Sequence, residues 1–335
     1  MKLSPNAYEV WKRRYAHPTE KIPEDTWHRV AKKVASVEKD GAHTDWEKRF
    51  FDMMNELRFL PNSPTIKNAG LSKGTLSACF VLPIEDTIEG ILETHRVAGV
   101  IEAAGGGIGY GFGDVRPKGS KISSPQAEAC GPIAVMQHLS SLGNMITQGF
   151  REGAHMGQLP ISHPDIREFI HYKDRADVVE NFNISVQITD AFMRTVADDG
   201  KWQLVSRGHY KGELVSAREL WDEICESAWR TGDPGVVFMD RVWETQPHDR
   251  WGPIESSNPC GEQFLEPYGN CNLGSINLAK FVSTRQANEI MWDELKTTIR
   301  YAVRFLDDVV DVNWFPDPKL EDVGKSMRRI GLGVM

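Results

Sequence analysis

The chain has 335 residues, of which 40% are hydrophobic and 26% are charged, a balance typical of a globular protein with a sizeable core. A formal net charge of -8 at neutral pH argues against sequence-independent binding of nucleic acid. No apolar run approaches the length of a membrane span, and the first residues lack the apolar stretch of a secretory signal. We therefore expect a cytoplasmic protein that binds neither nucleic acid nor membrane.

The cysteines follow neither the spacing of a zinc site nor that of a C-x-x-C redox motif, and the sequence predicts no metal site. Their odd number in a large chain argues against a structural disulfide framework, but it leaves room for a redox-active pair. We expect Cys225 to fill the core, because it shares a helical face with Trp221 and Ile224. The five cysteines are Cys79, Cys130, Cys225, Cys260 and Cys271.

The N-terminal region, residues 1–58, is predicted to be helical. Amphipathic spacing with aromatic anchors indicates helices over residues 6–17, 25–39 and 45–57. Residues 58–70 contain two prolines and an Asn-Ala-Gly sequence, and these predict a loop. We take the remainder, residues 59–335, as one larger region.

The larger region alternates strand and helix patterns. A buried strand is predicted over residues 75–82, and most of the alternation follows residue 164. This order predicts an α/β fold with a largely parallel sheet, crossover helices and enough repeats to curl toward a barrel. Further strands are predicted at 181–188, 202–206 and 235–240, and helices at 86–99, 132–148, 165–172, 190–200, 216–232 and 293–312.

The last of these helices has two distinct faces. Phe305, Leu306 and Val309 lie on the predicted core side together with Ala302 and Val310. The other side carries an acidic cluster that could suggest a metal site, but we favour a solvated or capping face. The cluster consists of Asp307, Asp308 and Asp311.

A glycine-rich run covers residues 103–122, but no register in it gives G-x-G-x-x-G or a phosphate-binding P-loop. Its glycines at 107, 109, 111 and 113 alternate, which predicts a strand with one face against another backbone or a ligand. A tightly packed glycine strand without a ligand is the alternative. Residues 120–131 and 150–157 are predicted to be loops, and Arg151 in the second could contact phosphate or carboxylate.

Residues 257–278 carry the strongest chemical signal. Asn258, Cys260 and Glu262 alternate, so in an extended segment their side chains can face one cavity. Pro259 and Gly261 between them argue against a helix and for a tight loop. An amide, a thiol and a carboxylate together can bind hydroxyl groups, perform sulfur chemistry and accept a proton. A surface turn with an incidental cysteine is the alternative.

Several segments, in the same order along the chain, resemble the catalytic subunit of ribonucleotide reductase. The sequences of these segments are most similar to those of the adenosylcobalamin-dependent class II enzymes. The resemblance runs from about residue 50 to residue 335 and implies the N-terminal part of a ten-stranded α/β barrel, in which a loop carries a radical cysteine to the centre. A small helical region precedes it. The segments are FLPNSPTIKNAG, LSACFVLPIEDTIEGI, GGGIGYGFGDVRPKG, REGAHMG, NPCGEQFL, GNCNLGSINL and RRIGLGVM.

The resemblance also implies catalytic roles. Cys260 would become a thiyl radical that removes the ribose 3'-hydrogen, and Glu262 would take the 3'-hydroxyl proton. Asn258 would hold the ribose hydroxyls. Cys79 and Cys271 would be the two reducing thiols, of which one protonates the departing 2'-hydroxyl and both end as a disulfide.

Nucleotide contacts follow from the same resemblance. The residues that align with a site for a deoxynucleotide or ATP effector are Asp86, Thr87, Ile88 and Arg116. Some class I relatives have a second basic residue at this site, but this chain has Ser123 at that position. The loops at 120–131 and 151–157 would connect effector to substrate choice. The implied substrate-binding residues are Ser63, Ala78, Cys79, Gly107, Asn258 and Glu262.

The implied partners are a ribonucleotide substrate, a thioredoxin-like reductant, the C-terminal half of the reductase and a second copy in a homodimer. We expect this chain to be the N-terminal half, without room for an ATP-binding cone, and to be inactive and prone to association by itself. Two alternatives stay open. One is a class I large subunit that uses a separate radical-generating subunit, and the other is a catalytically silent fragment that acts in assembly or regulation.

Overall fold

The computed structural model describes residues 3–39, 41–71, 74–122, 127–146, 153–174, 179–206, 211–246, 252–283 and 289–335. The chain forms two compact units. The first unit comprises Met1–Ala78, Ala104–Gly106 and Asn270–Met335, and the second comprises Cys79–Ala103 and Gly107–Gly269. None of the described helices combines the length and the apolar character needed to cross a membrane.

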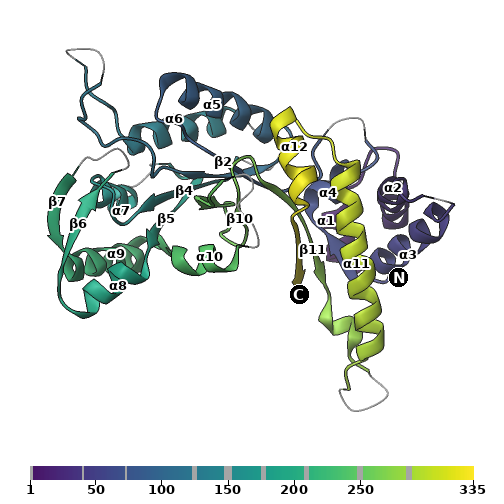
Figure 1. The fold of residues 1–335 in the computed structure, drawn as a ribbon. Coiled ribbons are helices and arrows are strands. Elements are labelled where there is room, and N and C mark those ends of the chain that lie inside the picture. Colours follow the sequence, from purple (N-terminus) through teal and green to yellow (C-terminus); the bar gives the residue numbers. More distant parts are fainter. Residues whose placement is uncertain are drawn as a thin grey trace. The chain divides into compact units, whose positions relative to one another are not determined.

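The first unit places helices around a small sheet (Figure 1). Strand β11 pairs with β1 in antiparallel and with β12 in parallel orientation, with Leu60 opposite Ser275 and Gly274 opposite Leu332. The apolar segment near the end of the sequence, Ile330–Val334, is strand β12. The elements are α1 (Pro5–Arg14), α2 (Pro23–Ala35), α3 (His43–Asn55), β1 (Phe59–Pro61), α4 (Ser63–Asn68), β11 (Asn270–Ile276), η2 (Leu278–Phe281), α11 (Trp292–Val312), α12 (Pro318–Met327) and β12 (Ile330–Val334).

The core of the first unit lies between α2, α3, α11 and the sheet. Phe50 of α3 and Phe59 of β1 both meet the ring of Phe305 edge-on, at centroid distances of 5.1 and 5.3 Å. All the residues predicted for the core face of α11 are buried, so that prediction is confirmed. Burial of these large rings contributes to the hydrophobic stabilisation of this unit.

One prediction for the first unit was wrong, and another holds only in part. Residues 58–70 form β1 and α4 instead of a loop, because Asn62 caps α4 through a bond from the Thr65 N–H (3.1 Å) and Pro64 lies in its first turn. The acidic cluster of α11 is solvated only in part: the side chains of Asp307 and Asp311 are 43% and 42% exposed, but Asp308 is buried. Arg328 pairs with Asp307 and Asp311, each at 2.8 Å.

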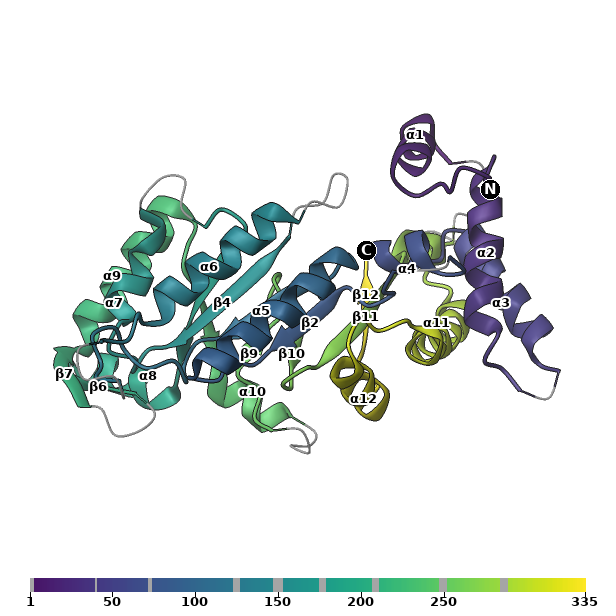
Figure 2. The ribbon, with the colours of Figure 1, turned by 90° about the horizontal axis from the view of Figure 1, so that it is seen from above.

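The second unit is built on a parallel sheet in the order β2-β3-β4-β5-β8, which agrees with the predicted parallel α/β fold. Helices α5 and α6 run side by side in Figure 2. The sheet strands are β2 (Cys79–Leu82), β3 (Gly107–Gly111), β4 (His155–Pro160), β5 (Phe182–Ile188) and β8 (Gly235–Phe238). Around them lie α5 (Ile88–Ala103), α6 (Pro132–Met145), α7 (Ile166–Ile170), η1 (Tyr172–Asp174), α8 (Asp190–Ala197), α9 (Ala217–Thr231) and α10 (Met239–Thr245). Two antiparallel pairs are β6 (Lys201–Val205) with β7 (Lys211–Ser216) and β9 (Ser256–Ser257) with β10 (Phe264–Leu265).

The second unit departs from the sequence prediction at strand β4, at strand β7 and at Cys225, among other places. His155–Pro160 is strand β4, although the run 150–157 was predicted to be a loop; residues 150–152, and with them Arg151, lie outside the described residues. Strand β7 was missed. Cys225 is exposed, because the buried stripe of α9 runs through Leu220, Ile224 and Ser227 and leaves the cysteine one position outside it.

Candidate active site

The glycine face of β3 lies against the segment 255–259. A Cβ atom at Gly109 would stand 1.6 Å from the Ser257 carbonyl oxygen, and one at Gly111 would stand 2.9 Å from the Glu255 carbonyl oxygen. No side chain fits in so small a space. The alternating glycines are therefore required for close contact between two backbones, as the sequence predicted.

The segment continues into a tight turn between β9 and β10. The Asn258 side-chain oxygen accepts from the Gln263 N–H, and the Asn258 carbonyl accepts from the Gly261 N–H, both at 3.0 Å. Gly261 has a φ of +84°, a left-handed conformation that favours glycine. The three alternating residues thus lie on a tight turn, as Pro259 and Gly261 predicted. Asn258 is buried, whereas Cys260 and Glu262 are exposed.

The turn nevertheless brings two of its side chains to the thiol of Cys79 at the start of β2. The Asn258 amide donates to Cys79 Sγ at 3.2 Å, and the Cys79 thiol donates to a Glu262 carboxylate oxygen at 3.7 Å. Cys79 is 4% exposed. A buried thiol between an amide donor and a carboxylate can exchange a proton with that carboxylate.

Amide side chains from β4 and β5 hold this turn, and sequence reasoning missed them. The Gln158 amide donates to the Ser257 hydroxyl at 2.8 Å. Asn183 donates to the Pro259 carbonyl at 2.7 Å, and Gln187 donates to the Glu255 carbonyl at 2.5 Å. Asn183 and Gln187 are four residues apart on β5 and thus share a face, a spacing that a search for polar residues in buried strands could have found.

Other predicted site residues lie in the first unit. Cys271 is buried on β11, and its carbonyl accepts from the Ala78 N–H at 3.1 Å. Ser63, at the start of α4, is exposed, and its hydroxyl lies 3.0 Å from the Tyr15 hydroxyl. The predicted Cys79–Cys271 pair stays a prediction, because these two thiols belong to different units.

The four predicted effector residues gather at the N-terminal end of α5. Arg116 forms an ion pair with Asp86 at 2.6 Å, and its backbone N–H donates to the same carboxylate at 3.2 Å. Thr87 accepts from the Gly90 N–H at 3.0 Å, and Ile88 is 69% exposed. Ser123, the position of the missing second basic contact, lies outside the described residues.

A second buried polar cluster lies in the same unit and was not predicted. Glu102 and His155 are both buried, and their carboxylate and imidazole atoms are 3.5 Å apart. Burial raises the pKa of Glu102 to about 7 and lowers the pKa of His155 to about 4. At neutral pH the imidazole is therefore neutral. Its other nitrogen lies 3.4 Å from the Tyr110 hydroxyl.

Comparisons with known proteins give the family. Residues 77–335 match the family "Ribonucleotide reductase, barrel domain", and residues 1–74 match "Ribonucleotide reductase, all-alpha domain". The whole chain is 43% identical to a vitamin B12-dependent ribonucleoside-diphosphate reductase of Thermoplasma acidophilum and 41% identical to one of Mycobacterium tuberculosis H37Rv, covering 44% and 49% of those proteins.

A Variola virus ribonucleoside-diphosphate reductase large subunit is 30% identical over 85% of the chain, which covers 41% of that protein. The chain thus spans about half the length of the curated relatives it matches. The match to the barrel domain confirms the predicted fold class. The chain belongs to the ribonucleotide reductase large-subunit family, and its similarity to the two vitamin B12-dependent members extends over its whole length.

Proposed function

We propose that this chain supplies radical and reducing groups for the reduction of ribonucleoside diphosphates to deoxyribonucleotides. The supporting observation is the convergence of Asn258 and Glu262 on the buried thiol of Cys79, with Cys260 on the same turn. A silent assembly fragment would not need these groups together. The names of the relatives support the diphosphate as substrate.

Each group has a role in a balanced reaction. A thiyl radical at Cys260 removes the ribose 3'-hydrogen while Glu262 accepts the 3'-hydroxyl proton and Asn258 holds the hydroxyls. The 2'-hydroxyl leaves as water after it receives a proton from Cys79 or Cys271. These two thiols together supply two electrons and become a disulfide, and the 3'-hydrogen then returns from Cys260.

Cys79 is the better proton donor to a reacting group near Glu262. Its thiol already donates toward the Glu262 carboxylate, and Asn258 donates to its sulfur. The carboxylate that accepts the 3'-hydroxyl proton and the thiol that gives a proton to the 2'-hydroxyl are therefore neighbours. One cluster can accordingly serve both proton transfers.

We further propose adenosylcobalamin as the cofactor, because the two cellular relatives are vitamin B12-dependent reductases. The turn fits this proposal, because Cys260 is exposed and a Cβ at Gly261 would meet no described atom within 4 Å. When bound, the cofactor supplies the radical chemistry. A class I large subunit would instead depend on a separate radical-generating subunit, and activity that persists without cobalamin would favour that alternative.

Regulation and partners are part of the same proposal. Asp86, Thr87, Ile88 and Arg116 would bind a deoxynucleotide or ATP effector, whose phosphates would compete with Asp86 for the guanidinium of Arg116. Ser63, Ala78 and Gly107 would contact the substrate. A thioredoxin-like reductant, the C-terminal half of the reductase and a second copy would complete the enzyme.

The test is a cysteine replacement in a reductase that contains this chain together with the remaining length of its relatives. Cys260→Ser keeps the shape of the turn, but its O–H bond is too strong to yield the radical, so turnover should vanish while nucleotide binding persists. Cys225→Ser, at an exposed cysteine of α9, is the matched control and should retain full turnover. Residual reduction by Cys260→Ser above a small fraction of the control would refute the assignment.

A further inference from the structure

A network of buried side-chain hydrogen bonds lies in the first unit, beside the backbone of the two cysteines proposed as reductants. Ser77 lies two residues before Cys79, Asn270 directly precedes Cys271, and Asn313 follows the last residue of α11. The three polar residues are 3%, 5% and 8% exposed, respectively. Polar groups this deep in a protein cost free energy unless they are paired, so their partners show what the network holds.

The side chain of Asn313 holds the segment before Cys79. Its oxygen accepts from the Leu76 N–H at 2.6 Å and from the Thr75 hydroxyl at 3.3 Å, and its nitrogen donates to the Ser77 hydroxyl at 3.1 Å. The opposite amide orientation would place its NH2 group against the Leu76 N–H, so the observed orientation is required. One side chain therefore fixes three consecutive residues.

The Ser77 hydroxyl extends the network to the segment that carries the second cysteine. It accepts from Asn313 and donates to Asn270 Oδ1 at 3.3 Å. The Asn270 amide in turn donates to the Leu320 carbonyl of α12 at 2.9 Å. Helices α11 and α12 both contact β11, as Figure 1 shows. The bonds therefore run from the end of α11, through both cysteine-bearing segments, to α12.

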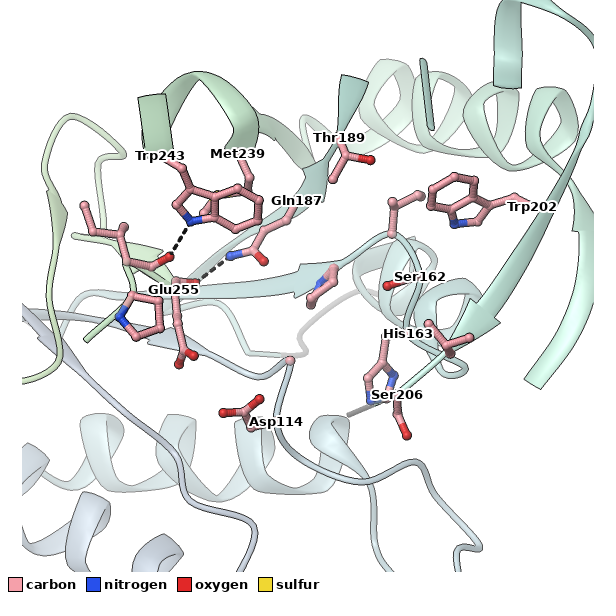
Figure 3. A pocket seen from close by; sticks show the side chains of 16 residues that line it. Asp114, Ser162, His163, Gln187, Thr189, Trp202, Ser206, Met239, Trp243 and Glu255 are labelled. Atoms are coloured by element: carbon pink, nitrogen blue, oxygen red, sulfur yellow. Dashed lines mark hydrogen bonds between the residues drawn. The ribbon is translucent and has the colours of Figure 1, made fainter. Parts of the chain in front are cut away.

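The surroundings of the network leave it little freedom. The Ala78 N–H donates to the Cys271 carbonyl at 3.1 Å and so joins the two segments directly. A Cβ atom at Gly324 of α12 would stand 2.7 Å from Asn270 Nδ2, so a glycine is needed beside this amide. The cavity of about 340 Å³ in the second unit (Figure 3) is lined by none of the side chains of the network. These polar groups thus bond to one another and do not line that cavity.

A reducing pair of cysteines makes strict demands on its backbone. A disulfide forms without strain only when the two Cα atoms are about 4.4–6.8 Å apart and the torsion about the S–S bond is near 90°. The pair also has to change between two thiols and a disulfide at every turnover, so the backbone beside each cysteine must keep its place in both states. Directional hydrogen bonds restrict position more closely than apolar contacts do. A hydrogen-bond network that reaches both segments meets this demand.

We propose that Asn313 and Ser77 are positioning residues for the pair Cys79 and Cys271. They hold the two backbone segments in the arrangement in which the thiols close into a disulfide. The inference rests on the proposed function, because it takes these two cysteines as the reducing pair. Removal of either polar side chain should therefore make the disulfide less favourable, although neither side chain takes part in the sulfur chemistry.

The test is a redox titration in glutathione buffers, without nucleotide, of a reductase that contains this chain together with the remaining length of its relatives. Two protein thiols and one oxidised glutathione give one protein disulfide and two reduced glutathione molecules, and peptide mapping by mass spectrometry gives the fraction of Cys79–Cys271 disulfide. Ser77→Ala interrupts the network and should lower the equilibrium constant about threefold. Asn313→Ala also leaves the Leu76 N–H without its acceptor and should lower the constant about tenfold.

Ser227→Ala, the same change at a buried serine of α9, is the matched control. The Ser227 hydroxyl donates to the Ile170 carbonyl at 3.1 Å within the second unit, so its loss should leave the equilibrium constant unchanged. Unchanged constants in Ser77→Ala and Asn313→Ala, or an equal decrease in Ser227→Ala, would overturn the inference and leave the proposed function intact. If the unsubstituted reductase formed no Cys79–Cys271 disulfide, the proposed function would fail together with the inference. Ser77→Ala decides the question if Asn313→Ala does not fold.

Discussion

The close contact between β3 and the segment 255–259 can be tested at Gly109. In Gly109→Ala the new methyl group would stand 1.6 Å from the Ser257 carbonyl oxygen, so one of the two backbones must move by more than about 1 Å. Strand β3 is paired on both sides, with β2 and β4, and cannot yield easily. The segment that carries Asn258 must therefore move.

The cost follows from the hydrogen bonds that this movement stretches. The Gln158–Ser257 and Asn183–Pro259 bonds each contribute about 1 kcal/mol, and steric strain adds a similar amount. We expect the free energy of unfolding to fall by about 2–4 kcal/mol. Because Asn258 would withdraw from the Cys79 sulfur, native-state alkylation of Cys79 should also become faster.

Gly99→Ala is the matched control in urea unfolding and thiol alkylation. The nearest contact outside its own helix, Ile146 Cδ1, is 3.7 Å from a Cβ at Gly99, and alanine favours the helix by up to about 1 kcal/mol. Both changes reduce the entropy of the unfolded chain equally. If Gly109→Ala were as stable as Gly99→Ala and left Cys79 protected, the account of the glycine face would be refuted.

Two further changes test polar groups by urea unfolding at different pH. In Asn183→Asp a carboxylate replaces the amide that donates to the Pro259 carbonyl. We expect the free energy of unfolding to fall by about 1–3 kcal/mol near neutral pH and by less near pH 4, where a protonated carboxyl group can donate. An equal loss at both pH values would contradict this. Burial, and to a lesser extent the nearby negative charge of Glu38, raises the pKa of Asp308 to about 8. The stability that this carboxyl group contributes is therefore complete below its ordinary pKa of 3.8 and is lost as the pH rises through about 8. Asp308→Asn should therefore gain stability over the wild-type protein as the pH rises from about 5 to about 9, and a constant difference would show that Asp308 is ionised throughout.

Local patterns were sufficient where a residue's role depends on its own neighbours in sequence. The alternation of Gly107, Gly109 and Gly111 predicted contact with a backbone, and the spacing of Phe305 and Val309 predicted the core face of α11. Both follow from strand and helix periodicity alone. The family resemblance, which rests on many short segments in order, supplied the fold.

Predictions failed where a residue type is typical of two kinds of local structure, or where its partner is distant in the sequence. Asn62 and Pro64 are typical of loops and equally of helix starts, so α4 was missed. Cys225 is one position away from the buried stripe of α9, a difference that hydrophobic spacing does not resolve. The roles of Asn183 and Gln187 depend on a segment about 70 residues away, and only the folded chain brings them together.

The central claim is that Cys79 and Cys271 supply the electrons for a reduction started at Cys260. A single turnover without external reductant, in a reductase containing this chain, tests it most directly. Deoxynucleotide and a disulfide should form in equal amounts, and peptide mapping should locate the disulfide at Cys79 and Cys271 while Cys130 and Cys225 stay reduced. Deoxynucleotide formed while both thiols remain reduced, or with a disulfide at other cysteines, would contradict the account.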